Sequence, residues 1–195
     1  MADKIFPGIF RRLRGYCVVM ADTIAFARFE QAVMPHLHAA YNLARWLLRD
    51  HHDAEDAVQD AYLRAFRFFD SFDGVDARAW LLAIVRNRCR SVLGQSSRRA
   101  EVTEFDEKMH LADDSVPDPE SGALRNAEIV SLRTCMDYLP AEYREVVVLR
   151  ELEQMSYKEI AVSAAVPVGT VMSRLARARI RLKDCITARV RGAAR

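Results

Sequence analysis

Residues 156–182 constrain the fold more than any other part of this chain, because they encode two helices joined by a tight turn. Ser156 and Glu159 have the spacing of a capping box, in which each side chain satisfies a backbone N–H group at a helix start. Pro167 cannot continue that helix, but it suits the first turn of a second one. The pattern predicts a helix-turn-helix with its turn near Ala165.

The second helix of this motif has an apolar stripe opposite a polar one. The stripe expected to face the core consists of Val171, Leu175, Ala178 and Leu182. Hydroxyl and guanidinium groups on the other side suit the major groove, where arginine binds guanine edges or neutralises phosphates. An ordinary solvated basic helix is the alternative, since residues 168–191 hold seven basic residues and one acid. We favour duplex DNA binding through Val168, Thr170, Ser173, Arg174, Arg177 and Arg181.

The rest of the chain predicts an all-α protein with two small helical domains joined by a flexible acidic linker. Only seven Gly and six Pro among 195 residues favour helices, and 51% hydrophobic residues suffice for two cores. Residues 101–121 carry eight acids and one Lys, which is typical of a solvated connector and also suits contact with the basic helix. We expect an N-terminal extension at 1–25, a helical domain at 26–95, the linker at 96–127, the helix-turn-helix domain at 128–187 and a basic tail at 188–195.

No membrane insertion is expected, because no apolar run approaches the roughly 20 residues that span a bilayer. The N-terminal extension lacks the apolar region of an export signal, and Met20-Ala21-Asp22 repeats Met1-Ala2-Asp3, so it is a disordered tail or precedes the true start. The cysteines are too dispersed for a zinc site or a disulfide scaffold. We expect a cytoplasmic protein with reduced thiols at Cys17, Cys89, Cys135 and Cys185.

The N-terminal domain begins with apolar residues at three-and-four spacing over 26–48, where Pro35 kinks the helix or starts another. Asp53 is the expected N-cap of the following helix. The outer face of that helix combines carboxylates with an exposed leucine. Such a face suits a basic partner helix, because charge sets the orientation and the apolar contact supplies burial. The expected docking residues are Asp56, Gln59, Asp60 and Leu63.

A further helix, capped by Asp76, interleaves aromatic and basic side chains over residues 77–90. Aromatic rings stack on unpaired bases and cations hold phosphates, a combination that binds single-stranded nucleic acid. A place in the core is the alternative for the tryptophan. The expected single-strand contacts are Phe72, Arg78, Trp80, Arg86, Asn87 and Arg90.

Four segments in order resemble the extracytoplasmic-function (ECF) sigma factors of the sigma-70 family. They are 53–66 (DAEDAVQDAYLRAF), 79–87 (AWLLAIVRN), 139–150 (LPAEYREVVVLR) and 169–179 (GTVMSRLARAR). They resemble regions 2 and 4 of that family, and the resemblance covers about residues 26–186 except the linker. Ala165 departs from the family pattern, because a glycine is usual at that place in the turn.

The resemblance implies a noncatalytic subunit that binds core RNA polymerase, directs it to a promoter and helps open the duplex. The helix with Asp56 would dock on the coiled coil of the β′ subunit, and residues 139–150 would face the β flap. Residues 72–90 would hold the melted minus-10 element, whereas residues 168–181 would read the minus-35 element. An anti-sigma factor is a further implied partner.

Two other classes of protein remain open at this point. A stand-alone repressor or activator would use the same helix-turn-helix, but would not need the acidic face or the aromatic helix. A metal-dependent enzyme or sensor would draw its ligands from His36, His38, His51, His52 and Cys89. Because these residues lack the His-Glu-x-x-His pattern, we expect no metal and no cofactor.

Overall fold

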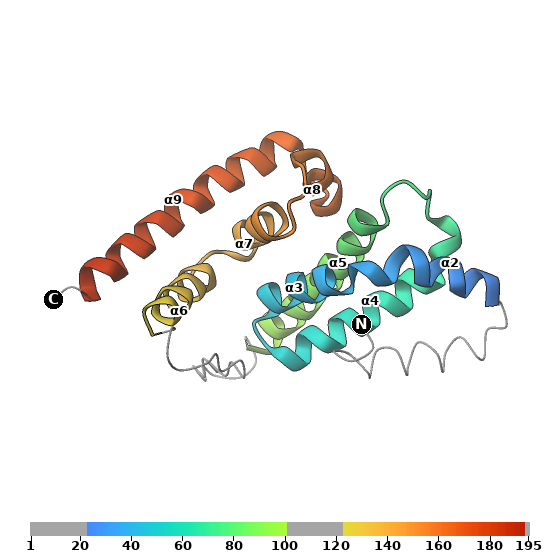
Figure 1. Cartoon of the computed structure of the whole chain (residues 1–195), viewed down its shortest axis with the longest axis horizontal. Coiled ribbons are helices and arrows are strands. Elements are labelled where there is room, and N and C mark those ends of the chain that lie inside the picture. Colours follow the sequence, from blue (N-terminus) through green and yellow to red (C-terminus); the bar gives the residue numbers. More distant parts are fainter. Residues whose placement is uncertain (1–22, 101–122, 194–195) are drawn as a thin grey trace.

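The computed structural model describes residues 23–100 and 123–193, and in these ranges the chain consists of helices and their connecting turns (Figure 1). The all-α prediction is confirmed. Most of the predicted N-terminal extension and of the acidic linker lies outside the described residues. The N-terminal domain comprises α2 (Thr23–Val33), η2 (Met34–His36), α3 (Leu37–Leu48), α4 (His51–Arg67), η3 (Phe69–Ser71) and α5 (Ala77–Ala100).

The core of the N-terminal domain lies where α3, α4 and α5 pack on one another. Phe29, Leu43, Val58 and Leu81 are fully buried there. The break expected at Pro35 is present as the 3-10 turn η2 between α2 and α3. Because proline lacks an N–H and fixes φ, it ends one helix while allowing the next to begin at a new angle.

The N-cap of α4 is Asp50, so the prediction of Asp53 was wrong. Arg49 adopts φ 67° at the end of α3, and Asp50 follows in an extended conformation. The Asp50 carboxylate then accepts a hydrogen bond from the Asp53 backbone N–H at 2.9 Å. At the start of α5 the prediction is confirmed, since Asp76 accepts from the backbone N–H of Ala79 at 2.9 Å.

The C-terminal domain consists of α6 (Ala123–Asp137), α7 (Ala141–Val147), the π-helical turn η4 (Val148–Leu152), α8 (Tyr157–Ala164) and α9 (Val168–Ala193). Its helix-turn-helix is formed by α8 and α9. The capping box is confirmed, because Ser156 and Glu159 exchange side-chain and backbone hydrogen bonds. Ala165 takes the left-handed conformation, φ 51° and ψ 46°, that closes α8. The predicted basic tail belongs to α9 as far as Ala193.

A disulfide joins Cys135 on α6 to Cys185 on α9, with Cα atoms 5.7 Å apart. The prediction of four reduced thiols was therefore wrong. The two cysteines lie 50 residues apart in sequence, and they meet because α9 packs against α6. Cys89 is a free, buried cysteine, and Cys17 lies outside the described residues.

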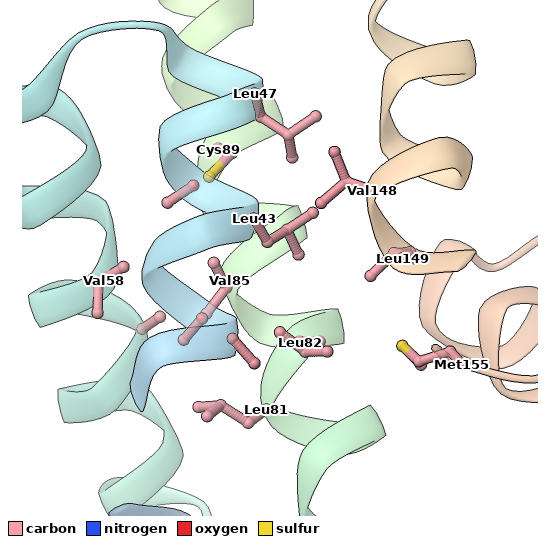
Figure 2. Packing of buried hydrophobic residues seen from close by; sticks show 14 of the residues in the cluster. Leu43, Leu47, Val58, Leu81, Leu82, Val85, Cys89, Val148, Leu149 and Met155 are labelled. Carbon is pink, nitrogen blue, oxygen red and sulfur yellow. The ribbon is translucent and has the colours of Figure 1, made fainter. Parts of the chain in front are cut away.

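The two domains pack on each other through α5 with α8 and α3 with α7 (Figure 1), and their buried apolar side chains form one cluster. Figure 2 shows Leu43, Leu47 and Leu82 of the N-terminal domain facing Val148 and Leu149 from across the interface. All of these side chains are buried. Within the described residues, no single helix is long and apolar enough to cross a bilayer, and α8 with α9 passes that test only across a 101° bend.

Candidate nucleic-acid interface

Helix α9 presents one face to the core and the other to solvent. Val171, Leu175 and Ala178 are buried as predicted, and Leu182 is half-buried. Among the predicted DNA contacts, Val168, Ser173, Arg177 and Arg181 are exposed, whereas Thr170 and Arg174 are half-buried. A helix with one apolar stripe and an exposed opposite face is suited to insertion into a groove.

Three arginines of α9 contact other side chains of the protein or are partly buried by them. The Arg181 guanidinium lies over the Tyr143 ring, 5.2 Å from its centroid. Arg179 donates to Glu151 at 2.7 Å. One terminal nitrogen of Arg174 is buried without a hydrogen-bond partner. Among the predicted arginine contacts, Arg177 is thus the most directly accessible to DNA on the exposed face of α9.

The exposed face of α9 also contains residues that the sequence reasoning missed. Met172 is 53% exposed, and Val168, a predicted contact, is 39% exposed one helical turn earlier. Apolar side chains in the major groove contact the methyl group of thymine. Met172 could have been recognised from the sequence, because it directly precedes the predicted contact Ser173 and lies outside the buried stripe.

An aromatic cluster lies at the start of α5. The rings of Phe72 and Trp80 have centroids 5.0 Å apart, and Phe69 stacks on Phe72 at 5.9 Å. All three side chains are half-buried, and those of Phe69 and Trp80 pack against the core. Trp80 therefore has the core contacts of one alternative, and part of its surface remains accessible.

A hollow opens beside this cluster. Its lining includes the rings of Phe69 and Phe72 together with Arg28 and Gln31 of α2. Gly74, with φ 80°, turns the chain at its edge. Sequence reasoning missed Phe69, although it lies only three residues before Phe72. It also missed Arg28 and Gln31, because α2 is about 40 residues from the aromatic turn and only packing brings them together. Rings beside a cation and an amide can stack on a base and bind its edge.

The predicted basic and amide contacts of α5 divide into two groups. Asn87 and Arg90 are exposed. Arg86 is 4% exposed and donates through Nε to Glu145 of α7 at 2.8 Å. Arg78 donates to Glu153 at 2.5 Å. In this arrangement, two predicted single-strand contacts are therefore engaged by carboxylates of the C-terminal domain.

At the interface between the two domains, burial is the largest cause of the pKa shifts of Glu145 and Arg144. Glu145 is 2% exposed, and desolvation raises the pKa of its carboxyl, although the neighbouring Arg86 acts in the opposite direction. Burial also lowers the pKa of Arg144 to about 10. The Arg144 guanidinium donates to the carbonyl oxygens of Leu139 at 2.8 Å and of Trp46 at 2.9 Å, thereby bridging the domains. Sequence reasoning did not identify either role.

The acidic face of α4 is formed largely as expected. Asp56 and Asp60 are exposed, and Gln59 is half-buried. Asp60 also binds Arg88 of α5 at 2.8 Å. Leu63 is not fully exposed as predicted, because it is half-buried and packs against the core. The face is thus more polar than the sequence suggested.

The histidines considered as metal ligands do not assemble with other donors. Among the described residues, no three His, Cys, Asp or Glu side chains are placed to hold a metal ion. His51 instead contacts the Tyr41 hydroxyl at 2.5 Å and Glu55 at 3.4 Å. Burial lowers the pKa of His36, which lies apart in η2.

Two family models match this chain, one in each domain. Residues 32–99 match sigma-70 region 2, and residues 129–182 match sigma-70 region 4. The chain belongs to the sigma-70 family. Several of its relatives are ECF sigma factors, and as a sigma factor it directs RNA polymerase in transcription initiation. The match to region 2 disfavours a stand-alone repressor or activator, which would need the helix-turn-helix alone.

Among the relatives, the ECF sigma factor SigE of Mycolicibacterium smegmatis is 33% identical over 84% of this chain. This chain spans 63% of that relative's length. The sigma-H factor of Pseudomonas aeruginosa is also 33% identical, over 77% of this chain and 82% of its own.

Two solved structures resemble this sigma factor. One is the sigma factor RpoE in complex with the anti-sigma factor NepR from Bartonella quintana. It has a TM-score of 0.67 and 29% identity, and the match covers 82% of this chain and 97% of that one. The other, CnrH in complex with the cytosolic domain of CnrY, has a TM-score of 0.61 at 24% identity and supports the fold.

Proposed function

We propose that this sigma factor divides promoter recognition between its two domains. The N-terminal domain binds the melted minus-10 strand, and α9 reads the minus-35 element as duplex. The observation that carries the proposal is the presence of two different surfaces in one chain. One is an aromatic hollow beside cations, and the other is an exposed helix face that suits a groove.

At the minus-10 element, an unstacked base would enter the hollow and stack on Phe72 or Phe69, with Trp80 supporting the ring cluster. Asn87 and Arg90 are exposed further along α5 and would hold the strand backbone. Stacking accepts any base, so an amide such as Gln31 is suited to add base preference. Arg78 and Arg86 join this surface once their carboxylate partners are removed.

At the minus-35 element, α9 would enter the major groove with Thr170, Ser173 and Arg177 directed at the bases. Arg181 lies further along the helix and suits a phosphate contact. Arg174 contributes only after its half-buried guanidinium turns outward. A helix docked through its N-terminal residues has this division between base and phosphate contacts.

Core polymerase would bind the acidic face of α4 through Asp56, Gln59 and Asp60, with Leu63 at its edge. The β′ coiled coil is the proposed partner for this face. Residues 139–150 would contact the β flap, which requires the domains to separate because most of this segment is now buried. The factor would act in the cytoplasm and would bind without catalysing a reaction.

An anti-sigma factor is the proposed regulator. The support is that the similar RpoE structure, at 29% identity, is a complex with an anti-sigma factor. Such a partner would act by holding the promoter and polymerase surfaces out of reach.

Run-off transcription tests the proposed function. Core polymerase would be incubated with sheared genomic DNA, with and without this sigma factor, and the new 5′ ends would be mapped. New starts that share two upstream elements are the expected result. An absence of new starts, together with tight binding of the protein to duplex DNA alone, would favour the stand-alone regulator instead.

A further inference from the structure

Two glutamates of the C-terminal domain bind two arginines of α5 across the domain interface. Glu145 of α7 accepts from Arg86 at 2.8 Å, and Glu153 accepts from Arg78 at 2.5 Å. The carboxylates are 2% and 6% exposed, so both are largely removed from water. Arg86 and Arg78 lie eight residues apart on α5, which is slightly more than two helical turns and a rotation of about 80°, so both pairs lie on the side of α5 that faces the C-terminal domain.

The chemistry of these pairs matches that of a nucleic-acid backbone. A carboxylate and a phosphate both offer anionic oxygens in a geometry that suits the guanidinium fork. The two carboxylates beside Arg78 and Arg86 therefore resemble phosphates in their charge and in the geometry of their oxygens. In addition, helix α8 packs against α5. It therefore blocks access of a nucleic-acid strand to this part of the α5 surface.

The interface has a composition that allows it to open. A buried ion pair adds little net stability, because desolvation of both charges offsets their attraction. When the domains separate, each charge regains water, so the polar part of the contact is readily reversed. Apolar side chains complete the contact, among them Leu43, Leu47 and Leu82, which face Val148 and Leu149 (Figure 2).

We infer that Glu145 and Glu153 act as internal substitutes for DNA phosphates, which keep Arg86 and Arg78 from binding the promoter strand until the two domains separate. This inference rests on the proposed role of α5 in holding the minus-10 strand. The aromatic hollow is open in the same arrangement, and Asn87 and Arg90 are exposed. The free factor therefore retains part of the strand-binding surface and lacks its two masked cations.

The test measures binding of the full chain to a short, fluorescein-labelled single strand of mixed sequence by fluorescence anisotropy. The variant is Glu145→Gln with Glu153→Gln, which removes both charges and keeps a hydrogen-bond acceptor at each position. Asp184→Asn, which removes an exposed carboxylate of α9, is the matched control. We expect the double variant to bind roughly tenfold more tightly, a typical coupling between two linked equilibria, and the control to match the wild type.

Two further measurements separate masking from other causes. Small-angle X-ray scattering reports a larger radius of gyration if the double variant opens. Adding Arg78→Gln and Arg86→Gln to it should abolish the gain in affinity, because the released cations are then absent. If the double variant unfolds by circular dichroism, Glu153→Gln alone serves in its place, since its partner Arg78 is at the rim, with a side chain 33% exposed.

An unchanged affinity in the glutamine variants overturns the inference, and so does a gain that persists without the two arginines. Run-off transcription distinguishes this failure from failure of the proposed function. If the wild-type factor initiates transcription while the glutamine variants gain no single-strand affinity, the masking is refuted and the proposed function stands.

Discussion

Cys135 and Cys185 are joined by a disulfide that encloses α7, η4, α8 and α9 as far as Cys185 in one covalent loop. Their sequence separation is 50 residues. Closing a loop of that size removes conformational entropy from the unfolded chain, which stabilises the folded domain by about 4 kcal/mol in the chain-entropy model. The helix-turn-helix domain is thus stabilised by a covalent link as well as by its core.

The first prediction concerns this disulfide. Treatment with a strong reductant should lower the melting temperature of the C-terminal domain, because the loop constraint on its unfolded state is lost. The measurement is thermal unfolding by circular dichroism with and without the reductant. Cys135→Ser with Cys185→Ser should melt at the lower temperature in both conditions. A reductant that lowers the melting temperature of this double variant equally would contradict the assignment.

The second prediction concerns the cap of α4. The Asp53 backbone N–H donates to the Asp50 carboxylate and lowers the pKa of that group. Asp50→Ala should therefore reduce the free energy of unfolding at neutral pH by about 1 kcal/mol, the usual loss for a removed N-cap. Asp53→Ala, which would be the damaging change if Asp53 were the cap, should cost less.

The pH dependence follows from the direction of that pKa shift. A carboxyl with a lowered pKa in the folded state stabilises the protein above its unfolded pKa, about 3.9 for Asp. The contribution is lost as the pH falls through the lower, folded pKa. The difference in the free energy of unfolding between the wild type and Asp50→Ala should thus become smaller below about pH 4. Urea unfolding at several pH values measures this difference. A difference that becomes larger in acid would refute the assignment of Asp50 as the N-cap of α4.

The capping residues also illustrate what the sequence can reveal. The box at Ser156 and Glu159 was predictable, because both partners lie within one helical turn. The cap of α4 was not, since the choice between Asp50 and Asp53 depends on the left-handed conformation of Arg49. Likewise, the burial of Arg86 depends on a partner 59 residues away, which no local pattern contains. Amphipathic stripes therefore predicted the helices, whereas pairings between helices required the structure.

The third prediction concerns the aromatic hollow. Phe72→Ala should weaken single-strand binding by roughly ten- to a hundredfold, because stacking of one base contributes about 1–3 kcal/mol. Run-off transcription from a linear promoter should fall as well, whereas transcription from a pre-melted template should be less affected. Phe68→Ala is the control, since Phe68 is exposed but does not line the hollow. Equal losses in both variants would indicate that the hollow has no special role.

The last prediction compares two arginines of α9 that the sequence treats alike. Arg177 is exposed, whereas Arg174 is half-buried and adds to the positive charge that acts on Glu145. If α9 docks through its exposed face, Arg177→Ala should cost about 1–3 kcal/mol of duplex promoter binding and relax base preference at one position. Arg174→Ala should weaken promoter binding less than Arg177→Ala does, and should lower the free energy of unfolding more.

Electrophoretic mobility shifts on a mapped promoter measure which substitution weakens binding more, and Arg191→Ala is the control for the loss of one positive charge. The two arginines lie on the same helix and have the same charge, but they differ in their exposure. A larger loss of binding for Arg174→Ala would therefore show that α9 rotates, or that the domain rearranges, on binding DNA.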